Sequence, residues 1–392
     1  MDKRAVGLSL FAGSVFTVSP AQADFTVGGI NIGIQPRING GAMYYEYSQP
    51  TVGVERAQAN LNTAQLEDDV NQIFVGFGLA PGSITSLATV SPEQSFETST
   101  WLPTLGGGAT LFVDRFYVDG YAQHAFTGND KTSQDQDTAI SLFSQATGEV
   151  GGTPTRLDLG AAAFSQVHEA FDVDIDRTEW SISAGYAVTE NFSVYAGYKS
   201  AETAFKQRGK QGVVQQQITT TAEAFDGNTG APITDPITGN PVTVGETVIQ
   251  TGTLSRDVER EFEYDGPFIG AVYGVPINKG FLDGIMAFNL AIAFLDGEVT
   301  ETERNRVLTL DGQTSTAPER KAIIEGNTTG LTLGLSWKGS TPIEGLSYLV
   351  GVDGYKYDFS GDKVKLQGQT IHTDTQIDET VINIRVGASY IF

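Results

Sequence analysis

Apolar and polar residues alternate with a period of two in several segments of this 392-residue chain. In residues 381–392 every even position is apolar, and the odd positions include Asn383 and Arg385. Successive side chains of a β-strand point to opposite faces, so this period predicts strands with one apolar and one polar face. The same alternation marks residues 180–188, 192–200, 286–294 and 330–337. The chain is therefore predicted to be all-β.

Arg385 indicates which face of the last strand is which. An arginine facing lipid at the bilayer midplane costs about 2–4 kcal/mol, so Arg385 is expected to point into the lumen of a barrel. The same alternation elsewhere gives a set of lumen-facing residues: Tyr117, Asp119, Tyr121, Tyr195, Lys199, Asn289 and Arg385. It also gives a set of outward aromatic residues expected at the membrane interface: Trp180, Tyr186, Tyr198, Trp337, Tyr390 and Phe392.

The strands and their spacing fit a transmembrane, antiparallel up-and-down β-barrel, most simply of ten strands, with eight and twelve as alternatives. Counting back from a periplasmic Phe392 makes the connections at 114–116, 189–191, 276–284 and 340–345 short periplasmic turns. Longer extracellular loops are then expected near 48–98, 127–170, 206–257, 304–322 and 360–376. Residues 73–79 and 242–251 also alternate and would raise the count to twelve, whereas residues 54–70 are typical of a short helix.

Two of the predicted strands change phase. In residues 346–359 the apolar positions move from even to odd around Asp353 and Gly354, and a similar change occurs around Gly266 and Pro267. Such a shift indicates either a β-bulge or the point at which the strand leaves the bilayer.

The first residues have the order of a secretory signal peptide. Lys3 and Arg4 precede an apolar stretch at 5–18, and small residues lead up to Ala23 and Asp24. We expect cleavage between Ala23 and Asp24, which removes residues 1–23 and leaves 24–392 as a single barrel domain.

Composition narrows the function further. A net charge of -23 argues against nucleic-acid binding, because that requires clustered Lys and Arg. The chain contains no cysteine, which excludes disulfides and cysteine-based zinc sites.

The signal peptide, the alternating strands and the terminal Tyr390-Ile391-Phe392 together resemble the outer-membrane β-barrel proteins of Gram-negative bacteria as a class. The resemblance implies export through the periplasm to the outer membrane, and contact there with lipid and lipopolysaccharide. It also implies that the barrel-assembly machinery reads the last strand. It identifies no narrower family and leaves the oligomeric state open.

No catalytic, cofactor-binding or metal-binding residues are expected. The resemblance does raise the omptins, ten-stranded outer-membrane proteases that use acidic pairs and an Asp–His couple at the barrel rim. The residues that such an enzyme could use are Asp172, Asp174 and Asp176, with His372 near Asp374. Alternating Asp residues are equally typical of a solvated strand, and no nucleophile elbow is present, so we do not expect an enzyme.

Two functions fit the predicted barrel better. Many inward positions are small, which favours a narrow, porin-like channel for small solutes. The alternative is a surface-binding, adhesion or structural protein in which the barrel carries functional extracellular loops.

Overall fold

A computed structural model describes residues 25–27, 30–49, 71–72, 74–75, 79–90, 96–150, 153–226, 228–234, 240–241, 243–277, 283–366 and 368–391. The predicted cleavage site at Ala23 and Asp24, the predicted helix at 54–70 and the terminal Phe392 lie outside these ranges. The strands are β1 (Phe25–Val27), β2 (Ile30–Gln49), β3 (Leu79–Val90), β4 (Phe96–Val113), β5 (Phe116–Val150), β6 (Thr153–Ala187), β7 (Phe192–Asp226), β8 (Thr243–Ile277), β9 (Gly284–Leu310), β10 (Gln313–Thr316), β11 (Arg320–Ser340), β12 (Leu346–Leu366) and β13 (Gln369–Tyr390).

Ten of these strands form a closed antiparallel ring. Its order is β2, β4, β5, β6, β7, β8, β9, β11, β12 and β13, and β13 pairs again with β2. The all-β, antiparallel prediction is confirmed. In the described ranges, β1, β3 and β10 lie outside the ring and pair with single strands of it. No helix in these ranges is long and apolar enough to cross a membrane.

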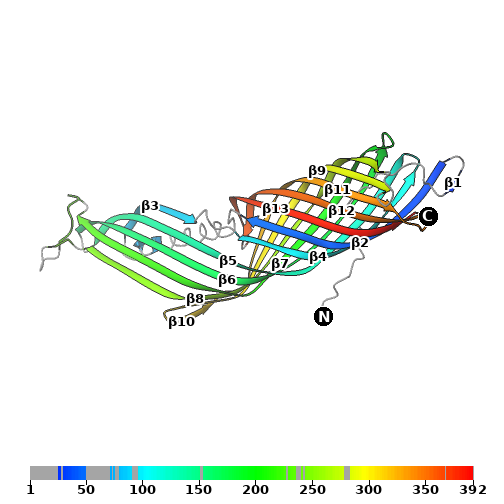
Figure 1. Cartoon of the computed structure of the whole chain (residues 1–392). Coiled ribbons are helices and arrows are strands. Elements are labelled where there is room, and N and C mark those ends of the chain that lie inside the picture. The colour runs from blue at the N-terminus through cyan, green and yellow to red at the C-terminus, as the bar shows by residue number, and fades with distance from the viewer. Residues whose placement is uncertain are drawn as a thin grey trace, which may run out of the picture.

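At one end of the ring, neighbouring strands are joined by short connections. β4 turns into β5 at Asp114 and Arg115, and Asp114 adopts the left-handed conformation with φ 54°. Residues 188–191 connect β6 to β7, and residues 341–345 connect β11 to β12, as the alternation predicts. The C-terminal end of β13 lies at this same end of the barrel (Figure 1). We call it the short-turn end.

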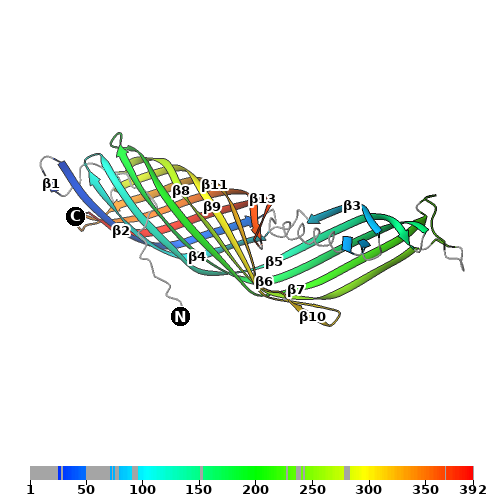
Figure 2. The same cartoon turned by 180° about the vertical axis from the view of Figure 1, so that it is seen from behind.

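The opposite end carries an arm rather than loops. Strands β5, β6, β7 and β8 each contain 35 residues and continue past the other strands as one curved sheet (Figures 1 and 2). The register places Thr138, Ser165, Gln216 and Gln250 in one row across these strands. We define the arm as β3 with the residues beyond that row: 138–150, 153–165, 216–226 and 243–250.

The arm corrects the loop predictions at 127–170 and 206–257. Those segments are mostly strand, because each residue continues the backbone ladder of its neighbour and residues 213–221 are rich in Val, Ile and Thr. Of the alternative strand at 73–79, residues 74–75 are helical, as are residues 71–72, and β3 begins only at Leu79. Residues 73 and 76–78 lie outside the described ranges. The alternation at 242–251 does mark a strand, but it belongs to β8 in the arm.

The predicted loops at 304–322 and 360–376 are also mostly paired strand. β9 folds back on itself as a hairpin with β10 through Asp311 and Gly312, and β12 pairs with β13 up to Leu366 and Gln369. Of the loop predicted at 48–98, the described part contains the helical residues, β3 and the start of β4.

The outer face of the ring changes from apolar to acidic along nine of its ten strands, the exception being β5. Towards the short-turn end it exposes a band of large apolar side chains, among them Ile38, Leu105, Phe116, Ile182, Ile269, Phe288, Leu290, Ile292, Phe294, Leu333, Val350, Ile384 and Val386. Towards the arm it carries carboxylates, which we call the acidic belt: Glu46, Glu97, Asp176, Glu202, Glu263, Asp265, Asp296, Glu298, Glu325, Asp358 and Asp378. A tall apolar band around a closed ring is the surface that a membrane-spanning barrel presents to lipid.

Candidate functional site: the barrel interior

Side chains from strands that are not neighbours meet inside the ring. Arg177 on β6 contacts Glu379 on β13, although three strands separate them around the wall. Tyr47 on β2 and Phe262 on β8 are on opposite sides of the ring, yet their ring centroids are 6.2 Å apart. Such contacts can form only through the lumen, so they define the interior and show what occupies it.

The section nearest the short-turn end is filled by a polar network. Arg37 on β2 donates two hydrogen bonds, of 2.6 and 2.8 Å, to Asp119 on β5, and Thr110 donates to the same carboxylate at 2.5 Å. Arg385 forms an ion pair with Asp353 on the neighbouring strand β12. All these groups are almost fully buried. Buried charges are tolerated when they are paired and hydrogen-bonded in this way.

Amide and phenol groups continue this network around the wall. Tyr121 donates to the Asn39 carbonyl oxygen at 2.8 Å, and Asn383 donates to Gln123 at 2.8 Å from the far side of β2 and β4. Tyr195 on β7 donates to Asn289 on β9 at 2.6 Å. The interior is therefore bonded across the lumen as well as along the wall.

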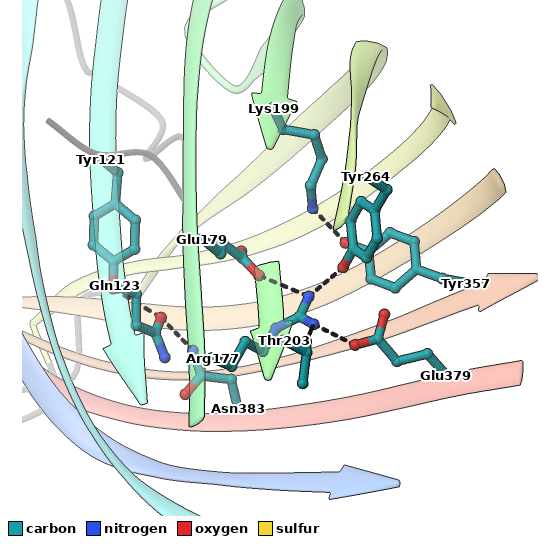
Figure 3. Close-up of polar contacts among 10 residues, drawn as sticks. All are labelled: Tyr121, Gln123, Arg177, Glu179, Lys199, Thr203, Tyr264, Tyr357, Glu379 and Asn383. Atoms are coloured by element: carbon teal, nitrogen blue, oxygen red, sulfur yellow. Dashed lines mark hydrogen bonds and ion pairs between the residues drawn. The ribbon is translucent and has the colours of Figure 1, made fainter. Parts of the chain in front are cut away.

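Arg177 is the centre of the next layer (Figure 3). Its guanidinium donates to Thr203 at 2.7 Å, lies 3.4 Å from Glu179 and contacts Glu379 and the Tyr264 hydroxyl. This one cation joins strands β6, β7, β8 and β13.

Lys199 and Tyr357 form a second link in this layer. Lys199 on β7 donates to the Tyr357 hydroxyl on β12, and its ammonium lies 4.8 Å from the centre of that ring. The Tyr357 ring in turn lies 4.7 Å from Tyr264, so both links belong to one connected cluster (Figure 3).

Above the Arg177 layer the interior becomes a hydrophobic core. Every one of the ten ring strands contributes a buried apolar side chain to it. We call its rings the aromatic layer: Tyr45, Tyr47, Phe96, Phe171, Phe205, Phe262, Tyr264, Tyr357 and Phe359. Phe205 lies 4.6 Å from Tyr47 and 5.9 Å from Phe96, so rings from distant strands interlock at the centre. The lumen is filled at this level.

A charged cluster lies beyond the aromatic layer, where the barrel joins the arm. Arg256 donates to both oxygens of Glu169 at 2.9 and 2.6 Å, and Arg320 lies 2.6 Å from Glu303. Arg260 donates to Glu301 at 2.5 Å. Burial opposes ionisation of Glu301, but the surrounding guanidiniums, Arg260 foremost, lower its pKa to about 2. Buried ion pairs therefore also occupy the interior where the barrel joins the arm.

The predicted lumen-facing residues lie in these interior layers. Tyr117, Asp119, Tyr121, Tyr195, Lys199 and Arg385 are buried, and Asn289 is half-buried beside Tyr195. Sequence reasoning missed Arg37, Arg177, Glu179, Asp353 and Glu379. The alternation that turns Arg385 inward, continued back along β13 through Asn383, is the signal that could have identified Glu379.

The five predicted interface aromatics that the structure describes lie on the outer wall. Tyr198 and Tyr390 are exposed, whereas Trp180, Tyr186 and Trp337 are half-buried against neighbours. Trp180 pairs with Tyr198 at 6.1 Å, and Tyr186 with Phe116 at 4.9 Å.

The acidic residues considered for protease chemistry are not brought together with histidine. Asp172, Asp174 and Asp176 lie on the outer face of β6, where Asn129 donates to Asp174 at 2.9 Å and Lys206 lies 4.0 Å from Asp176. His372 is exposed on β13, and three strands separate it from β6 around the ring. In the described ranges no group of three metal-binding side chains could hold an ion.

Comparisons with known proteins give little beyond the architecture. No family model matches the chain, and no curated protein matches it. The chain is a closed, antiparallel β-barrel with an apolar outer band. Among solved structures it is similar to the outer membrane protease OmpT from Escherichia coli, at 10% identity and a TM-score of 0.45, covering 95% of this chain and 100% of that one.

Two further solved structures are also similar, at lower TM-scores. The toluene transporter TodX of Pseudomonas putida matches at 9% identity and a TM-score of 0.20, covering 89% of each chain. A FadL homologue of Pseudomonas aeruginosa matches at 10% identity and a TM-score of 0.18, covering 92% of this chain and 90% of that one. The barrel class of this chain rests on its own closed ring and apolar outer band.

Proposed function

We propose that this chain is an integral outer-membrane protein whose sealed barrel anchors the arm outside the cell, where the arm makes binding or structural contacts. The observation that carries the proposal is the hydrophobic core around the aromatic layer, to which each of the ten ring strands contributes a buried apolar side chain. A lumen filled in this way offers no path to a hydrated solute. The sequence favours a narrow channel, but the filled interior supports its alternative, a surface-binding or structural barrel.

The length of the arm strands supports an external role. A membrane strand needs about 9–11 residues, whereas β5 to β8 contain 35 each. At about 3.3 Å per residue such a strand is about 115 Å long, so most of it lies beyond the apolar band. Short periplasmic turns and long extracellular extensions are the usual polarity of outer-membrane barrels. By that polarity, we expect the arm to lie outside the cell. Lipid contact and assembly through β13 remain parts of this proposal.

The first experiment measures conductance of the purified protein in a planar bilayer. We expect no current steps above those of the bare membrane, because the aromatic layer and the ion-paired layers on both sides of it close the lumen. Stepwise conductance by the wild-type protein would instead establish the channel and reject the sealed anchor.

The second experiment removes the arm. A variant lacks residues 79–90 and has 138–165 and 216–250 each replaced by an Asn-Gly turn, which suits a two-residue hairpin. We expect its barrel to fold, as judged by heat-modifiable migration on gels, while cells that display it lose attachment to surfaces and to one another. Unchanged attachment by a folded armless barrel would contradict an adhesive arm.

A further inference from the structure

The first residues of β8, 243–250, form an edge of the arm. β8 pairs with β9 only as far as Gly252, which is opposite Leu310, because β9 then turns at Asp311 and Gly312 into the β10 hairpin. The Asp311 amide donates to the Thr251 carbonyl at 3.1 Å and ends the ladder. In the described part of the chain, residues 243–250 pair with β7 alone. One row of their backbone groups therefore faces away from the sheet.

This edge lacks the usual protection against pairing. Natural edge strands are guarded by Lys, Pro, bulges or a covering element. Residues 245–250 contain none of these devices and a single charge, Glu246. Residues 245–249 are all exposed, and Val248 and Ile249 are 38% and 58% exposed. By contrast, β3 at the other edge carries Pro81 and an irregular register beside it. The β8 edge is thus open to a further strand.

We propose that this edge pairs antiparallel with the same edge of a second copy of the chain. A two-fold axis at Thr247 places that residue opposite itself, Glu246 opposite Val248 and Gly245 opposite Ile249. No two carboxylates then face each other, and each large side chain is opposite a smaller or differently charged one. The register one residue away would place Glu246 opposite itself, which like charges disfavour. The edge is therefore self-complementary, as an isologous contact requires.

The pairing has a consequence for where the two copies lie. Each β8 runs from the arm towards its own barrel (Figure 2). In an antiparallel pair the two barrels therefore lie at opposite ends of the joined arms. Given the proposed function, with the arm outside the cell, the two copies sit in facing membranes. The arm is then a homophilic contact between cells.

The test uses full-length protein in detergent and sedimentation equilibrium over a range of concentrations. We expect the wild type to form dimers. Thr247→Glu and Thr247→Lys each place like charges opposite one another and are expected to weaken dimerisation by about fivefold, from the usual size of cross-strand pairs. An equimolar mixture of the two variants places opposite charges together and is expected to restore the wild-type affinity.

The matched control is Thr253→Glu. Thr253 is an exposed threonine on the same strand and the same face, but it is paired on both sides, with Val213 and Thr309. We expect it to dimerise like the wild type. A monomeric wild type, an equal effect of Thr253→Glu, or a mixture that fails to recover would each overturn the proposal. A conducting wild type that still dimerises through Thr247 would reject the sealed anchor alone.

Discussion

Each ring strand has a lower section in the apolar band and an upper section towards the arm. The two sections place apolar and polar side chains on opposite faces of the barrel wall. On β12 near the short-turn end, Val352 is exposed outside and Asp353 is buried inside, paired with Arg385. A few residues away on the same strand, Asp358 is exposed outside and Phe359 is buried inside. The pairing of β12 with β13 continues without a shift between these two levels. The strand keeps its register while the chemistry of its two faces is exchanged.

The exchange follows from what surrounds each section. Lipid accepts apolar side chains on the outer face, which leaves polar groups for the lumen, where they must satisfy one another. Beyond the apolar band the outer face meets water, and the hydrophobic effect then drives apolar side chains inward. The upper section is consequently packed like a water-soluble barrel. It closes the lumen of the section below.

The core of the upper section should show the largest effect of a single substitution. Phe205→Ala removes a fully buried ring that contacts Tyr45, Tyr47 and Phe96. We expect it to lower the free energy of unfolding by about 4 kcal/mol, the usual cost of emptying such a site. Urea unfolding in lipid vesicles measures this loss. Phe164→Ala, on an exposed ring of the arm, should change stability by less than about 0.5 kcal/mol, and an equal loss there would contradict a packed upper core.

The Arg177 layer should show the next largest effect. Glu379→Ala leaves the Arg177 guanidinium buried with Glu179, at 3.4 Å, as its nearest remaining carboxylate. We expect a loss of about 3 kcal/mol, because breaking a buried pair strands a charge. The same unfolding assay applies, with the exposed Glu298→Ala as control. Equal free energies of unfolding for the two variants would contradict a requirement for Glu379 beside the buried Arg177.

The outer face of the lower section can be tested with an arginine. Val386 is 60% exposed in the apolar band, and Val213 is 63% exposed on β7, three residues before the arm begins. Val386→Arg should cost about 2 kcal/mol in lipid vesicles, because the guanidinium then faces hydrocarbon. Val213→Arg should be neutral to within about 0.5 kcal/mol. Similar losses at both positions would mean that the two outer faces meet the same solvent.

The exchange of faces also explains which parts of the fold the sequence could predict. Within the apolar band the alternation assigns Arg385, Lys199 and Tyr121 to the inward face, and all three are buried. The change at Asp353 and Gly354 is not a bulge, since the ladder is continuous there. Gly266 and Pro267 likewise remain in register with β7. Of the two interpretations that the pattern left open, a strand that leaves its apolar surroundings is the one consistent with this register.

The arm and the Arg177 layer were beyond sequence reasoning for different reasons. Residues 138–165 alternate weakly and are rich in Gly, Ala and Ser, so their pairing depends on long neighbours rather than on a local pattern. The partners of Arg177 come from positions up to 202 residues away, and nothing local links them. The alternation of apolar and polar residues predicts that a side chain points inward. It does not predict which inward side chain it will meet.

The acidic belt should give the smallest effect, and one of the opposite sign. Glu202 is directly opposite Glu263, which is opposite Glu298. Partial burial, and then the neighbouring carboxylates, raise the pKa of both Glu202 and Glu263. Ionising a group whose folded pKa is raised favours the unfolded chain. The row therefore does not reduce stability below the unfolded pKa of about 4.3, where its carboxyls are protonated. Stability is lost as pH rises through the folded pKa and the row ionises.

Glu263→Gln removes the central charge of this row. We expect it to stabilise the protein at pH 7 by about 0.5 kcal/mol, the scale of cross-strand charge pairs, and to have no effect near pH 4. Urea unfolding of the wild type and the variant at both pH values separates the effect of the Glu263 charge from that of the other carboxylates. Glu97→Gln, at a belt position opposite Ser48 rather than another carboxylate, is the control. A variant that is less stable than the wild type at pH 7 would mean that Glu263 is held by a favourable partner, and that the outer face of the upper section is not merely a solvated acidic surface.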